Sequence, residues 1–227
     1  MNKRIILIII CFLSVLVSAE LVGLVTKSAG NIEYKKFSGG KTKGGLPKGT
    51  LLFNEDVIIT GENGFAVFVY IDDQSQVKIQ NNTELVVRGA IEPGNIVKQI
   101  NVINGTIKAN VKKQKGGDFT VVSPTSVAAV KGTEFWGVIN ENVGDQFFGL
   151  SGMIEVTNII TGEMVELLAN TTAISLSDGS LQVAPTQSDD LPEDQDPDSE
   201  DEDGESEIRI PFQNESGEQK ELIIKFH

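Results

Sequence analysis

The sequence has very little of the chemistry on which most enzymes depend. Of its 227 residues one is a cysteine, Cys11, and one is a histidine, His227, the last residue. A Ser-His-Asp or Cys-His arrangement and a histidine-rich zinc site are therefore hard to build. We expect no enzyme, no cofactor and no metal site.

Basic patches are also missing. The net charge is −13, and no stripe of lysine, arginine and aromatic residues appears, which argues against nucleic acid as a partner. Twelve acids and no base lie in residues 189–207, so the rest of the chain sums to −1. The charge is thus concentrated in one segment, and the remainder is close to neutral.

The first nineteen residues have the pattern of a signal peptide. Lys3 and Arg4 precede an apolar run over residues 5–17, and small residues lead to a predicted cleavage between Ala19 and Glu20. The run is shorter than the roughly 20 residues that span a bilayer. We expect export to the periplasm, the cell surface or the medium, with no stable membrane span after cleavage. An uncleaved N-terminal anchor is the alternative.

Between residues 20 and 185 the chain reads as one all-β domain. Short alternating runs are separated by Gly, Asn and Asp, and no window of helical length outside the signal keeps a 3.6-residue apolar period. We expect a two-layer β-sandwich or roll, or a short solenoid-like sheet. Asn104-Gly105 is the best hairpin signal, because both residues tolerate positive φ.

Three stretches carry a family resemblance. Residues 130–135, Val-Lys-Gly-Thr-Glu-Phe, fit the pattern V-[RK]-G-T-E-F, residues 51–61 fit a strand pair ending in Thr-Gly, and residues 150–158 fit a repeat x-x-G-x-V-x-V. In their order along the chain, 51–61, 130–135 and 150–158, these stretches resemble FecR-like domains, the periplasmic sensor domains of iron-dicitrate transducers. The resemblance covers roughly residues 22–184 by a coarse reading.

The resemblance implies a β domain that receives a signal from another envelope protein. Transducers of this family join such a domain to a membrane helix and a cytoplasmic anti-sigma segment, neither of which the sequence predicts here. We therefore expect a stand-alone, non-enzymatic interaction module for cell-surface signalling, which binds an envelope protein or surface component. A structural scaffold of an envelope or extracellular assembly is the alternative.

The signature residues are the candidate site, either structural or for interaction: Lys131, Gly132, Thr133, Glu134, Phe135 and Trp136. Gly132 suits a bulge or a positive φ. Glu134 either contacts a partner or, as we favour, makes an ion pair or hydrogen bond that fixes the bulge. Phe135 and Trp136 point to opposite faces of a strand, so we expect one in the core and the other at an edge or surface.

Carboxylate pairs are read as turns rather than as catalytic groups. Asp72 and Asp73 are adjacent in a predicted turn, so their side chains are expected to diverge, and Glu55 and Asp56 precede a strand. An EF-hand-like calcium loop at residues 199–210 fails at both ends, where Ser199 and Ile210 stand.

The C-terminal part divides in two. Residues 186–207 are expected to form an acidic, disordered and self-repelling linker. In residues 208–227 two alternating apolar runs flank a turn, which predicts a β-hairpin. Because an isolated hairpin is marginal in water, we expect it to dock either on the protein's own sheet or on a partner.

Overall fold

The computed structural model describes residues 20–39, 45–93, 95–113, 119–196, 206–213 and 219–226; of the last two ranges only the backbone is described. The predicted signal peptide, residues 199–205 of the calcium-like loop and the hairpin turn lie outside these residues. Within them the only helical element is a single 3-10 turn, η1, Ser188–Asp190. The prediction of an all-β fold is confirmed.

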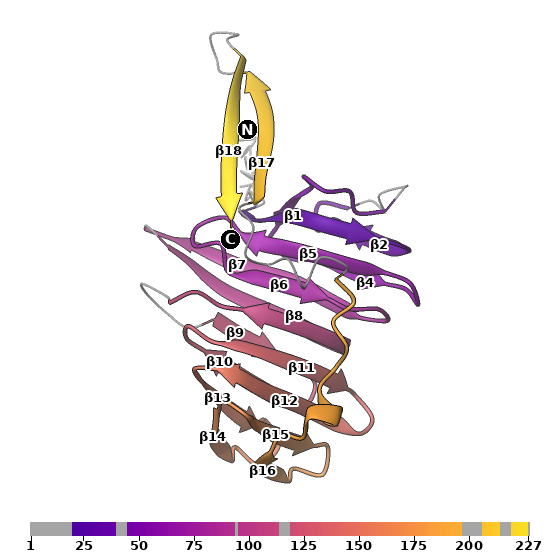
Figure 1. Ribbon diagram of the computed structural model, residues 1–227, viewed down its shortest axis with the longest axis vertical. Coiled ribbons are helices and arrows are strands. Elements are labelled where there is room, and N and C mark those ends of the chain that lie inside the picture. Colours follow the sequence, from indigo (N-terminus) through magenta and orange to yellow (C-terminus); the bar gives the residue numbers. More distant parts are fainter. Residues whose placement is uncertain are drawn as a thin grey trace, which may run out of the picture.

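Two layers of strands make up the domain (Figure 1). Layer A contains, in spatial order, β3 Leu51–Phe53, β1 Leu21–Ala29, β5 Phe65–Tyr70, β6 Gln76–Ile79, the second half of β8 Asn95–Asn110, β11 Glu134–Asn140, β12 Gly144–Ser151, β15 Thr171–Leu176 and β16 Leu181–Pro185. Layer B contains β2 Ile32–Lys35, β4 Asp56–Thr60, β7 Glu84–Glu92, the first half of β8, β9 Phe119–Val122, β10 Ser126–Val130, β13 Met153–Asn158 and β14 Met164–Leu168.

The chain passes back and forth between the layers as it progresses, so strands follow one another from β1 at one end to β16 at the other (Figure 1). All described pairings are antiparallel except that of β8 with β9. This is the two-layer roll that the alternation predicts.

The core lies between the layers. Strand alternation sends Val77 and Ile79 of β6 and Phe135 of β11 toward layer B, where each is fully buried. The rings of Tyr70 in layer A and Phe119 in layer B meet edge-on, with centroids 5.8 Å apart. Apolar burial of this kind is the main source of stability for a chain whose described part holds no cysteine.

The predicted hairpin at Asn104-Gly105 is wrong. β8 continues through both residues, pairing with β7 before this point and with β6 and β11 after it. Gly105 has a φ of +114°, and a Cβ there would lie 2.4 Å from the Cα of Thr83. The glycine thus allows β8 to pass close to Thr83 at the point where the strand crosses from layer B to layer A.

At the C-terminal end β17 Ser206–Gln213 and β18 Gln219–Phe226 pair antiparallel as a two-stranded sheet of their own. Ile208 is opposite Ile224, and Ile210 is opposite Leu222. Whether this hairpin docks remains a prediction.

Candidate functional site

A line of cross-strand neighbours runs over the outer face of layer A, the face turned away from layer B. Paired residues on adjacent strands share a face. The line, which we call the lysine row, consists of Lys27, Val67, Lys78, Lys108 and Trp136 on β1, β5, β6, β8 and β11. The row brings the ammonium groups of three lysines together on the face of layer A opposite to the apolar core.

Residues 191–196 lie across this row, and we call them the strap. The chain leaves β16, where the hydroxyls of Thr172 and Thr186 hydrogen-bond at 2.7 Å, and turns through η1. Figure 1 shows it then rising over β12, β11 and β8 toward β6. The acidic linker expected at residues 186–207 is thus packed against the domain over its first part, because its carboxylates meet the lysines.

Two carboxylates of the strap bind the row. Asp194 Oδ2 lies 3.4 Å from the Nζ atoms of both Lys78 and Lys108. Asp196 Oδ2 lies 3.0 Å from Lys27 Nζ and 3.3 Å from Lys78 Nζ. The side chains of Lys78 and Asp196 are only 3% and 1% exposed, so Lys78 is a buried cation shared between two anions.

Amide groups fix the position of the strap along the row. The backbone N–H of Gln195 donates to Gln80 Oε1 at 3.1 Å, and the N–H of Asn81 donates to Gln195 Oε1 at 3.0 Å. The N–H of Asp196 donates to Asp194 Oδ1 at 3.1 Å. These bonds define one register, which charge attraction alone would not.

The site holds Asp194 in its ionised form. Burial by itself would raise the pKa of Asp194, but the backbone N–H of Asp196 and the ammonium groups of Lys78 and Lys108 outweigh it. The net result is a pKa below the ordinary value of 3.8.

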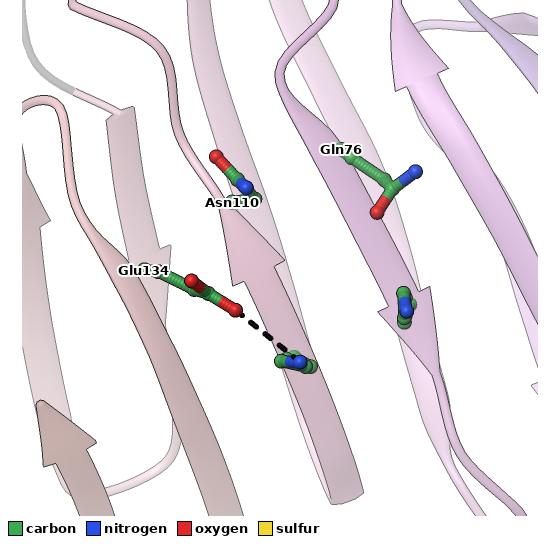
Figure 2. Close-up of a pocket in the computed structure, with 5 residues that line it drawn as sticks. Gln76, Asn110 and Glu134 are labelled. Atoms are coloured by element: carbon green, nitrogen blue, oxygen red, sulfur yellow. Dashed lines mark ion pairs between the residues drawn. The ribbon is translucent and has the colours of Figure 1, made fainter. Parts of the chain in front are cut away.

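Trp136 and Glu134 contact Lys108, which also binds Asp194 of the strap. Lys108 Nζ lies 5.6 Å from the centroid of the Trp136 ring and 3.2 Å from Glu134 Oε1. Figure 2 shows Glu134 pointing along this ion pair, with Gln76 and Asn110 on the neighbouring strands. The pocket lined by Gln76, Lys78, Lys108, Asn110 and Glu134 has room for about one water molecule.

The other signature residues build a junction of turns. Gly132 has a φ of +66°, and a Cβ on Gly152 would lie 2.8 Å from the Gly132 carbonyl oxygen. Thr133 exchanges backbone hydrogen bonds with Val111 and donates its hydroxyl to the Met153 carbonyl at 3.1 Å. The signature and the downstream Gly152 therefore meet in space, while Lys131 is exposed beside them.

One expectation about the signature fails. Phe135 and Trp136 do point to opposite faces, but Trp136 is only 4% exposed, like Phe135 at 0%. The expectation that one of the two lies at an edge or surface is therefore wrong, because both side chains are buried.

The predicted turn carboxylates are engaged in structural contacts. Asp72 and Asp73 do not diverge: their Oδ2 atoms lie 2.7 and 3.1 Å from the buried Nζ of Lys98. Glu55 pairs with Arg88 at 3.1 Å. Asp56 accepts hydrogen bonds from the Tyr34 hydroxyl and two backbone amides, and burial together with this carboxylate raises the pKa of Tyr34.

Besides the lysine row, sequence reasoning missed a group of buried polar side chains that lies between the layers. The buried carboxylate of Asp145 on β12 accepts hydrogen bonds from the hydroxyls of Ser123 and Thr125 at the β9–β10 turn. Asn158 on β13 donates to Ser175 on β15 at 2.9 Å. Both contacts join layer A to layer B, which favours a structural role.

Within the described ranges no group of three or more His, Cys, Asp or Glu side chains is arranged to hold a metal ion. No helix of the described part has the length and apolar character needed to cross a membrane.

Comparison with known proteins supports the resemblance. Residues 56–147 match the family model described as FecR protein. No curated protein matches the chain. Two solved structures from Parabacteroides distasonis, each named a "putative anti-sigma factor", are similar at 18% identity, with TM-scores of 0.49 and 0.48. The match covers 58% of this chain and 60% of each solved chain. The strands that bear most of the lysine row, from β5 to β11, lie inside the residues that match the FecR family model.

Proposed function

We propose that this protein is a non-enzymatic interaction module, exported to the periplasm or cell surface, which binds another envelope protein in a signalling-related role. The observation that supports the proposal is the FecR match over residues 56–147.

An apolar surface at the far end of the domain is the candidate contact. β14 is the terminal strand of layer B in the described part. Met164 and Leu168 on β14 are 57% and 54% exposed, and Met153 on β13 is paired with Leu168 on the same face. Ile159 and Ile160 in the connecting turn are exposed as well. A terminal strand with an exposed apolar face suits a protein that adds a strand or packs on the face.

Crosslinking of the purified protein to an envelope fraction tests this function. We expect the wild type to capture a specific protein and the Met164→Glu/Leu168→Glu variant to lose it. The Val143→Glu variant, altered at an exposed valine of the β11–β12 turn, serves as the control and should retain it. Absence of a specific protein would contradict the module and favour a structural scaffold.

Export has its own test. Mass spectrometry of protein from the envelope or medium should give a mature chain that begins at Glu20. A chain that begins at Met1 would instead make the first nineteen residues an anchor.

A further inference from the structure

The lysine row is a built recognition site. Lys78 is almost fully buried, and two carboxylates of the strap lie within 3.4 Å of its ammonium group. A buried ammonium without an anion is costly, so the row requires an acidic occupant whenever it is closed to water. The row needs carboxylates at these positions, and any segment that places carboxylates there meets this need.

The contacts specify that occupant in some detail. One carboxylate lies between Lys78 and Lys108, and the next, two residues further on, lies between Lys78 and Lys27. The residue between them is bound through its backbone N–H and its side-chain oxygen. The row therefore reads an extended acid-x-acid segment.

The present occupant is tethered close to the row. Only residues 186–190 separate the strap from the end of β16, which gives the strap a local concentration in the millimolar range at the row. Weak intrinsic binding is enough to close the row under these conditions. An acidic segment of another protein that also contacts this protein elsewhere can compete with the strap for the row.

We propose that the lysine row is a binding site for an extended acidic segment of a partner protein, and that the strap is a built-in occupant which this segment displaces. Displacement takes the strap carboxylates away from Lys78 and from Lys108, whose ammonium lies over the Trp136 ring. The partner therefore binds only as the strap leaves. This inference does not depend on the apolar surface of β13 and β14, since the two surfaces use different strands.

The test uses full-length variants and a fluorescent peptide with the sequence of residues 187–196. In the Asp194→Asn/Asp196→Asn variant the strap has lost the two carboxylates that bind the row, and the peptide should bind at least ten-fold more tightly than to the wild type. The Asp189→Asn/Asp190→Asn variant removes two exposed acids of η1 that do not face the row, and it should behave as the wild type.

Two further controls address specificity. A peptide with asparagine at the positions of Asp194 and Asp196 should not bind, and a scrambled peptide of equal charge should bind several-fold more weakly than the original.

Lys78→Gln in the strap-neutralised variant should abolish binding. Should that variant fail to fold, Lys27→Gln, whose side chain is 34% exposed, should still weaken binding several-fold.

Equal affinity of the peptide for the wild type and the strap-neutralised variant would overturn the proposal, because the strap would then not occupy the peptide's site. Absence of binding to either would overturn it too. Concentration-dependent dimerisation of the wild type would assign the row to the strap of a second copy and contradict a partner segment.

Discussion

The two faces of layer A are stabilised in different ways although they belong to the same strands. On β6, Val77 and Ile79 face layer B and are fully buried among apolar side chains, whereas Lys78 between them faces the strap. On β8 the same contrast separates Ile107 from Lys108. One period-two alternation thus places an apolar core on one side and an ionic contact on the other.

The comparison shows which face can open. Burial of a large apolar side chain contributes about 1.5–3 kcal/mol, and nothing in solution replaces that contact. An ion pair exchanges one set of polar contacts for another, so its net contribution is near zero to about 1 kcal/mol when the partners can return to water. The inner face should therefore hold the fold, while the outer face should respond to salt, pH and competing acids.

The largest effect is expected on the inner face. Phe135→Ala should lower the free energy of unfolding by about 3–5 kcal/mol, because it leaves a cavity between the layers. Phe37→Ala, at a 56% exposed position, is the matched control and should stay within about 0.5 kcal/mol. Urea denaturation measures both. Equal losses would contradict the placement of the core.

The turn that leads into β11 should give an intermediate effect. Gly132→Val should cost about 1–3 kcal/mol, because valine resists the positive φ and its Cβ would crowd Lys113. Gly162→Val is the comparison: Gly162 also has a positive φ, but no atom lies within 4 Å of the added Cβ. A melting temperature unchanged by Gly132→Val would remove the conformational argument.

On the outer face Lys78→Met should cost no more than about 1 kcal/mol of global stability, because the strap can carry its acids into water rather than keep them buried and unpaired. The emission of Trp136, the only tryptophan, should shift to longer wavelength as the strap leaves. A loss of about 3 kcal/mol or more, the value for a broken buried pair, would instead make the strap an integral part of the fold.

Acid should produce the smallest change in stability. The pKa of Asp194 is lowered in the folded protein, so its contribution is complete above the ordinary value of 3.8 and is lost as the pH falls through the lowered pKa. Asp194 faces Lys78 and Lys108, and Asp196 and Glu134 share these lysines. We expect the Trp136 emission to shift only below pH 3.8. Release already near pH 6 would contradict this assignment.

Local rules predicted much of the fold. Alternation predicted the all-β domain over residues 20–185, because a half-buried sheet repeats its side-chain environment every two residues. Gly132 was recognised as a residue for positive φ, and its φ is +66°. The prediction of a hairpin at Asn104-Gly105 failed because the positive φ that permits a hairpin also permits a strand to change layers beside Thr83.

The strap could not be predicted, because its contacts join residues far apart in the chain. Lys27 and Asp196 are separated by 169 positions. A partial signal was present: Lys78 and Lys108 each stand between two apolar strand residues, which indicates a row of cations facing outward. The acidic composition of residues 189–207 indicated solvation, and only the lysines on the other side of the contact explain why part of it is packed.

The passage of β8 through both layers has a consequence for how the domain melts. Its first half is hydrogen-bonded in layer B and its second half in layer A, with Gly105 at the crossing. Neither layer can separate without breaking a strand that the other layer also uses, so the layers should unfold as one cooperative unit. Amide protons on both halves of β8 should then exchange together and slowest of all, at the rate of global opening.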